Sequence, residues 1–278
     1  YCLSNEPIYV DARNSEHNAR LWRQYLTNRH RDIATLNALY DSEYASFDEL
    51  DPPDPGDLTP RPELYDWATF NNRRFAAWHL RMAREIRDID PEAKTHAKIM
   101  NLPFWRDTLT WGNDVEAFCD LSQIAGNDCS NNYNHNEDNE WGNGWQGEYQ
   151  YYDLLRSMRG QPVFNSENHV VADRNWRPVP GMHMRNLIWQ GAIHGQGAST
   201  MWVWERTYDN KSDFAGSVMH RPAFCDANGR AALDLMRLAP EVVKIQDAPA
   251  RVAIVSSVCR QVWNPDYSGL VSRAVPYN

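Results

Sequence analysis

Apolar residues in the first third of the chain recur at the spacing of helices. This spacing predicts helices around residues 21–26 and 33–39, followed by a long helix over residues 64–86. Residues 51–62 are rich in Pro and Asp, which is typical of a loop. We interpret the apolar run at residues 1–4 as the end of a strand that comes before these helices.

From residue 94 onward, short apolar runs alternate with amphipathic stretches. The predicted strands are 94–100, 121–125, 161–165, 198–204 and 251–256, and the predicted helices are 111–119, 147–158, 182–194 and 227–245. This alternation favours a parallel sheet with right-handed crossovers. Polar and aromatic residues gather in the loops after the strands, which is the layout of a (β/α)8 TIM barrel.

Only five barrel-like strands come before Arg251, whereas a closed barrel needs eight. We therefore expect residues 1–246 to be the C-terminal part of a catalytic barrel, about strands 4 to 8. Residues 247–278 are predicted to form a linker and the truncated start of a following α/β domain. The chain begins with Tyr1 and not with Met, so we interpret it as a fragment cut at both ends. Its localisation, cytoplasmic or periplasmic/secreted, stays open.

The composition narrows the class of partner. The chain has 278 residues, a formal net charge of -9 and 42% hydrophobic residues, which is typical of a globular domain and argues against a nucleic-acid partner. No apolar run approaches the roughly 18 residues of a membrane span, so no membrane partner is expected. Five cysteines without a C-x-x-C pair predict neither a zinc site nor a disulfide framework.

Twelve tryptophans are a high count for this length. Trp22, Trp67 and Trp78 fall on the apolar faces of the predicted helices, so we expect all three in the core. The polar loop at residues 131–147 holds further aromatic residues, among them Tyr133. Such a loop can either line a binding site or pack on its own aromatic anchors.

Two glutamates follow predicted strands. Glu6 comes after the first apolar run, and Glu167 follows the strand at residues 161–165. The loops at strand C-termini form the active sites of TIM barrels. Two carboxylates at that end can cleave a glycosidic bond, and in a retaining enzyme they lie about 5–5.5 Å apart.

The residues around these glutamates resemble a known family. Ser4-Asn5-Glu6 is similar to the Asn-Glu signature that ends the fourth strand in clan A glycoside hydrolases. Further matching segments follow in the family's order: Leu36-Asn37-Ala38, Asp66-Trp67, Ile124 to Asp128, Pro162 to Glu167, Trp189 to Gly195, and Trp202 to Arg206. Over nearly residues 1–246, the chain resembles glycoside hydrolase family 42, the β-galactosidases.

The resemblance implies a role for several residues. Glu6 would be the general acid/base and Glu167 the nucleophile of a two-glutamate double displacement. Asn5 would donate a hydrogen bond to the sugar hydroxyl next to the anomeric carbon, and Trp176 would form a wall of the sugar subsite. His169 follows the nucleophile by two residues, and we expect either a substrate contact or a supporting role.

The chain departs from the family pattern after its last barrel strand. The family usually has a Glu followed three residues later by a His, whereas here Glu205 lies between Trp204 and Arg206, and Asp213 is a later carboxylate. We count all four as candidate substrate-binding residues. Because these positions contact non-reacting hydroxyls, the departure affects which sugar is bound and leaves the hydrolytic mechanism intact.

Three hypotheses for the function follow from these residues and from the resemblance. The first is a retaining, exo-acting β-galactosidase with a carbohydrate substrate. The second is a clan A glycosidase for another β-linked sugar, such as a β-mannoside, a β-glucoside or a marine galactan oligosaccharide. The third is a non-catalytic relative, which would have no need of both Glu6 and Glu167. No cofactor and no metal are expected, because two carboxylates and water suffice. The resemblance also implies a homotrimer in the full-length protein.

Overall fold

A computed structural model gives the fold of the chain. It describes residues 1–9, 15–54, 61–101, 110–133, 149–172, 177–204 and 217–255, together with 257, 259 and 262. The strands within these ranges are β1 (Cys2–Asn5), β2 (His96–Met100), β3 (Ala125–Asp128), β4 (Val163–His169) and β5 (Gln196–Trp202). The α-helices are α1 (Glu16–His30), α2 (Ile33–Tyr40), α3 (Pro62–Ile89), α4 (Val115–Leu121), α5 (Tyr149–Arg159), α6 (Gly181–Ile193) and α7 (Pro222–Gln246).

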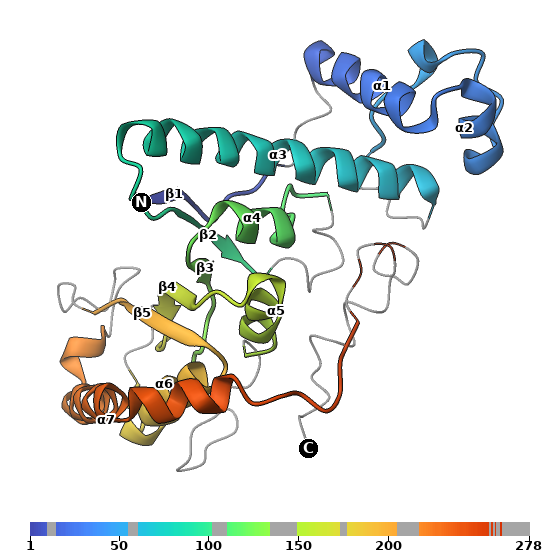
Figure 1. Ribbon diagram of the computed structural model, residues 1–278. Coiled ribbons are helices and arrows are strands. Elements are labelled where there is room, and N and C mark those ends of the chain that lie inside the picture. The colour runs from blue at the N-terminus through green and yellow to red at the C-terminus, as the bar shows by residue number, and fades with distance from the viewer. Residues whose placement is uncertain are drawn as a thin grey trace.

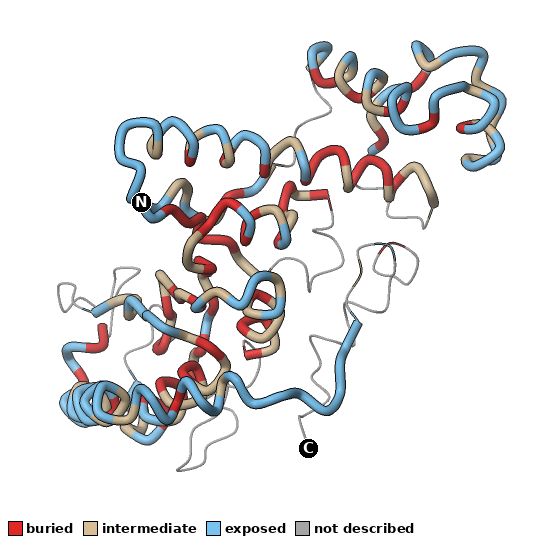
Figure 2. The backbone as a smooth tube through the Cα atoms, in the orientation of Figure 1, coloured by how far each residue is buried: buried red, intermediate tan, exposed pale blue. Residues whose placement is uncertain are grey.

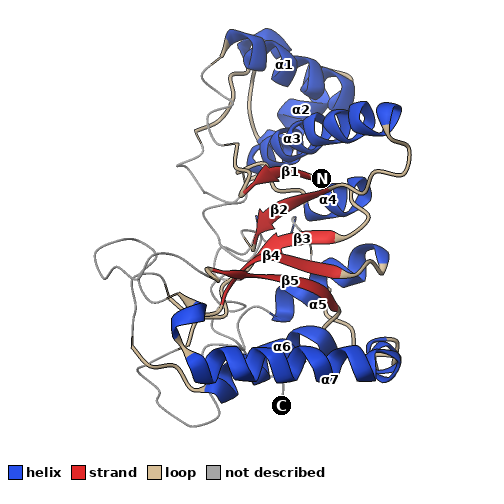
Figure 3. Cartoon of the chain, turned by 90° about the vertical axis from the view of Figure 1, so that its left-hand side faces the viewer, coloured by secondary structure: helices blue, strands red, loops and turns tan. Residues whose placement is uncertain are grey.

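The five strands form one parallel sheet in the order β1-β2-β3-β4-β5. Helices contact the strands that they follow or precede, and Figure 1 shows α3 to α7 around the outside of a curved sheet. Figure 3 shows the arrowheads of the strands along one edge. This is the architecture of part of a (β/α)8 barrel, as the alternating pattern predicted. None of the described helices is long and apolar enough to cross a membrane.

Several element boundaries differ from the prediction. The strand expected at residues 121–125 lies at Ala125–Asp128, because Leu121 is the last residue of α4. The Asp114 side chain caps this helix by accepting a hydrogen bond from the Ala117 amide, so α4 begins later and ends later than expected. No strand forms at residues 251–255, which are exposed.

Close packing between β2 and β3 depends on Gly126. A Cβ atom at this position would lie 2.5 Å from the carbonyl oxygen of Ala97 and would also meet the His96 ring. A side chain at this position would therefore push the two strands apart. The glycine thus holds Asp128, at the end of β3, next to the end of β2.

The packed face of α3 differs from the expected one. Its buried stripe after the first three turns is formed by Asn72, Ala76, His79 and Ala83, at spacings of three and four residues. Trp78, two positions after Ala76, points to the other side of the helix and is 58% exposed. The prediction that Trp78 is a core residue is therefore wrong, because small residues and not tryptophan pack against the sheet.

The described buried residues form three larger clusters: one packs α6 against α7, and two lie on helices α1 to α5. Of the latter two, one lies between the sheet and helices α4 and α5, with Ile99, Phe118, Tyr151 and Leu155 among its members. The other joins α1, α2 and α3 through fully buried aromatic residues. Trp22 and Trp67 pack there edge to face at 5.3 Å between ring centroids, which confirms both as core residues. Figure 2 shows that much of α7, by contrast, is exposed.

Candidate active site

Glu6 stands at the C-terminal end of β1. Its backbone amide donates to the Lys98 carbonyl oxygen at 2.9 Å, which continues the pairing of β1 with β2 by one residue. Its φ angle of 46° lies in the left-handed region, where non-glycine residues are uncommon and cluster at functional sites. The Asn5 side-chain amide donates to Glu6 Oε1 at 3.2 Å. The chain therefore turns sharply at the predicted acid/base.

Glu167 lies within β4, whereas the sequence placed it after the strand. The β4 strand runs on to His169, and its register with β5 shifts between Asn165 and Asn168. Irregular pairing of this kind re-aims side chains and is common next to active sites. The amide of Glu167 donates to Asn165 Oδ1 at 3.3 Å, which ties the irregular segment to a buried side chain.

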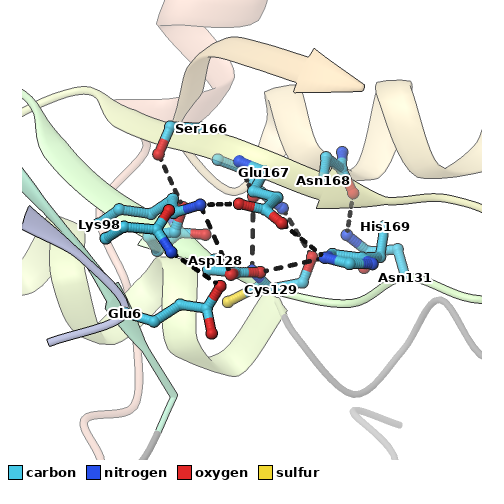
Figure 4. Close-up of polar contacts among 12 residues, drawn as sticks. Glu6, Lys98, Asp128, Cys129, Asn131, Ser166, Glu167, Asn168 and His169 are labelled. Carbon is cyan, nitrogen blue, oxygen red and sulfur yellow. Dashed lines mark hydrogen bonds and ion pairs between the residues drawn. The ribbon is translucent and has the colours of Figure 1, made fainter. Parts of the chain in front are cut away.

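Four charged or titratable side chains form a ring at the ends of β2, β3 and β4. The Lys98 ammonium is in contact with Glu167 Oε2 and lies 3.9 Å from Asp128 Oδ2. His169 Nε2 lies 3.3 Å from Glu167 Oε1 and 3.7 Å from Asp128 Oδ1. Figure 4 shows this ring together with the Glu6 side chain, whose carboxylate lies on the Asp128 side of the group. The topology thus brings Glu6, Glu167 and His169 into one site.

Three members of the ring have the donor atoms of a metal site. One ligand atom each from Asp128, Glu167 and His169 lies within 4.8 Å of the others. The ammonium of Lys98 already contacts Glu167 and approaches Asp128, so a positive charge is present beside these carboxylates. A divalent cation at the same place would have to displace it, and we assign no metal to the site.

A network of buried hydrogen bonds holds β4 in place. The Asn165 amide donates to the Tyr152 hydroxyl at 2.8 Å and to the Cys129 carbonyl at 2.9 Å. Burial raises the pKa of Tyr152 well above its ordinary value, so its hydroxyl keeps its proton. The Asn131 amide donates to Asn168 Oδ1 at 2.9 Å. These bonds fix the backbone on both sides of Glu167.

Comparison with known proteins identifies the family. Residues 1–238 match the sequence model of glycoside hydrolase family 42, described as beta-galactosidase. The chain belongs to this family. A beta-galactosidase from an Arthrobacter species is 23% identical over 237 residues, which are 80% of this chain and 31% of that protein.

Solved structures of family 42 enzymes have the same fold. An apo exo-carrageenase of family 42 from Bacteroides ovatus has a TM-score of 0.81 and 27% identity, over 97% of this chain and 40% of that one. The beta-galactosidase from Rahnella sp. R3 has a TM-score of 0.65 and 18% identity, over 90% of this chain and 38% of that one. The chain spans between 31% and 40% of the length of these relatives.

The remaining candidates from the sequence have different outcomes. Tyr133 is buried in a hydrophobic cluster with Val170 and Met184, and its ring packs on His183 at 5.3 Å. Its ring therefore packs in the core, and a sugar contact for Tyr133 remains a prediction. Trp204 is 44% exposed just after β5. Four candidates lie outside the described residues, namely Trp176, Glu205, Arg206 and Asp213.

Sequence reasoning did not include three residues of the site. Lys98 is the third residue of β2, and Asp128 is the last residue of β3 and of the segment Ile124 to Asp128 that matches the family. Trp202 packs its ring at 5.8 Å from the ring of His169. Each of the three lies in the last three residues of a parallel strand, and this position is the signal that could have found them.

Proposed function

We propose that the full-length protein is a retaining β-glycosidase that hydrolyses terminal β-D-galactosides. One observation carries the proposal: Glu6 and Glu167 stand at the C-terminal ends of β1 and β4 of the same parallel sheet, and their carboxylates belong to one cluster (Figure 4). Membership in family 42 supports hydrolysis as the reaction and a carbohydrate as the substrate.

The contacts favour different roles for the two glutamates. Glu167 touches the ammonium of Lys98, and an adjacent positive charge favours the ionised carboxylate that a nucleophile requires. Among the described residues, the side-chain partner of Glu6 is the neutral amide of Asn5. We therefore keep Glu6 as the general acid/base, the role that the family resemblance implies.

The reaction would follow the double displacement of retaining glycosidases. An oxygen of Glu167 attacks the anomeric carbon while Glu6 donates its proton to the leaving oxygen, and the glycosidic bond breaks. Glu6, now ionised, takes a proton from a water molecule, which attacks the same carbon and releases Glu167. Two carboxylates and one water account for every proton, so no cofactor is needed.

A second candidate substrate is a carrageenan oligosaccharide. The exo-carrageenase matches 97% of this chain with a TM-score of 0.81, whereas the Rahnella beta-galactosidase reaches 0.65. The departure from the family pattern around Glu205 and Asp213 also favours a sugar other than plain galactose. Both candidates share the two-glutamate mechanism and differ in what the −1 subsite accepts.

The first test is the variant Glu167→Gln in the full-length protein. We expect turnover of an aryl β-galactoside to fall by about 10⁴-fold or more, because loss of a catalytic group that acts in concert with others removes most of the catalysis. Glu92→Gln changes an exposed glutamate and is the matched control. Full activity of Glu167→Gln would refute the assignment.

A panel of substrates decides between the two sugars. Wild-type protein is assayed with aryl β-galactoside, aryl β-glucoside, aryl β-mannoside and carrageenan oligosaccharides, and kcat/KM is compared. Preference for the aryl β-galactoside supports the first proposal. Release of sugar from carrageenan oligosaccharides with little activity on the aryl substrates would support the second.

A further inference from the structure

We propose that Lys98 is a positioning residue that links the two catalytic glutamates: its backbone carbonyl fixes Glu6, and its ammonium holds Glu167 ionised and oriented for attack. This inference rests on the proposed function. It concerns the ionisation and orientation of Glu167, and it adds a residue to which the family resemblance assigned no role.

The position of Lys98 in the sheet makes both contacts possible. It is the third residue of β2, which lies between β1 and β3. Its carbonyl oxygen accepts from the Glu6 amide at 2.9 Å, and its ammonium reaches past the end of β3 to Glu167. A shift of β2 would therefore disturb the acid/base and the nucleophile together.

Burial makes the charge of Lys98 a strong local effect. Its side chain is 6% exposed, and those of Asp128 and Glu167 are 8% and 13% exposed. A charge removed from water is screened weakly, so its interaction with a neighbouring charge is larger than on the surface. Such a lysine needs anionic partners, and the ring supplies two of them.

The second anion has a function of its own during the reaction. Glu167 loses its negative charge when it forms the covalent bond to the sugar, and Lys98 would then be left without a counter-charge. Asp128, 3.9 Å from the ammonium, would remain beside Lys98 as a second anionic partner in the intermediate. The lysine can thus stay in place until water restores the Glu167 carboxylate.

The described charged and titratable groups that face Glu167 can be named. They are Lys98 from β2, Asp128 from β3, His169 from β4 and Glu6 from the end of β1. The two anions oppose ionisation of Glu167 by repulsion. Lys98 is the cation in direct contact with Glu167, so it is the group whose removal is expected to change Glu167 most.

The test is the pH profile of kcat/KM for Lys98→Gln in the full-length protein, with the substrate that wild type prefers. The acid limb of this profile reports ionisation of the nucleophile in the free enzyme. Loss of an adjacent opposite charge raises the pKa of a carboxyl by about one to three units, so we expect the acid limb to move upward by that amount. A merely structural role would lower kcat/KM without moving the limb.

Two further variants make the result decisive. Lys94→Gln removes an exposed lysine just before β2 and should leave the profile unchanged. Asp128→Asn removes a like charge near Glu167, so its acid limb should move downward, opposite in sign to Lys98→Gln. If Lys98→Gln does not fold, the direction of the Asp128→Asn shift decides, and an unmoved or raised limb overturns the proposal.

Failure of the inference can be told from failure of the proposed function. If Glu167→Gln retains full activity, the glycosidase assignment fails and the role of Lys98 fails with it. If Glu167→Gln is inactive while the acid limb of Lys98→Gln equals that of wild type, only the role of Lys98 is refuted.

Discussion

Two buried carboxylates in this molecule have similar partners and different surroundings. Asp66, on α3, lies 2.5 Å from Arg29 and 2.7 Å from His30, whereas Glu167 contacts Lys98 and lies 3.3 Å from His169. Each is thus a carboxylate with one long cation and one histidine. Asp66 is 1% exposed and joins the helices around the aromatic cluster, whereas Glu167 is 13% exposed at the ends of the strands.

The difference lies in the hydrogen-bond and ion-pair partners that surround each carboxylate. Asp66 also accepts a hydrogen bond from the Tyr40 hydroxyl at 2.8 Å, so three donors surround it. Burial, together with the Asp66 charge, raises the pKa of Tyr40, which therefore remains a donor. Glu167 keeps a more exposed carboxylate with a longer histidine contact. An ion-paired carboxylate is therefore a candidate catalytic group only where a substrate can reach it.

The largest effect on the strand-end region beyond the nucleophile is expected from Glu6→Gln. General acid catalysis contributes about 10²–10⁴-fold, so hydrolysis of substrates with poor leaving groups should fall by that factor. Aryl glycosides with a strongly acidic phenol need no proton in the first step and should lose less in that step. The dependence of kcat/KM on leaving-group pKa measures this, and an equal loss for all leaving groups would contradict the role of Glu6.

At the other carboxylate, Asp66→Asn should lower stability and leave the chemistry intact. Removing the charge of Asp66 costs about 1–3 kcal/mol, because Arg29, His30 and the Tyr40 hydroxyl lose a buried charged acceptor. Denaturant unfolding of the full-length protein measures the change in the free energy of unfolding. Asp88→Asn, at an exposed position of the same helix, is the control. A loss of kcat in the folded Asp66→Asn protein would contradict the conclusion that Asp66 contributes to stability and not to catalysis.

The barrel and the positions of the two glutamates at strand ends could be predicted because their signals are local. Alternating strands and helices give the parallel sheet, and Glu6 and Glu167 follow apolar runs that are short and distinct. The core positions of Trp22 and Trp67 follow from helical spacing, although Trp78 does not, because the face of α3 that meets the sheet is lined by Ala76 and other small or polar residues.

The ring around Glu167 could not be predicted because it depends on register. Lys98 and Asp128 come from different strands, and only the pairing of Met100 with Asp128, made possible by Gly126, sets their side chains beside β4. The environment of Tyr133 could not be predicted either. As an aromatic residue in a polar loop it was a candidate for binding sugar, whereas the fold buries it against α6 residues such as Met184.

The smallest predicted effect concerns His79, which links α3 to β1, the strand that precedes Glu6. Its Nδ1 donates to the Phe75 carbonyl at 2.8 Å, since that oxygen can only accept, so the neutral ring accepts at Nε2 from the Ser4 hydroxyl at 2.7 Å. Burial lowers the pKa of His79 below its ordinary value of 6.5. The folded protein therefore binds this proton less readily than the unfolded chain.

The sign of the pH dependence follows from that difference. Above pH 6.5 the ring is neutral in both states and its contribution to stability is complete. As the pH falls below 6.5, the unfolded chain takes up a proton first, so the free energy of unfolding decreases. His79→Gln should flatten this decline, whereas His17→Gln, at an exposed position of α1, should not. Unfolding curves between pH 5 and 8 measure how steeply the free energy of unfolding changes with pH. An equal slope for wild type and His79→Gln would mean that other groups cause the pH dependence, such as His96, whose pKa is also lowered.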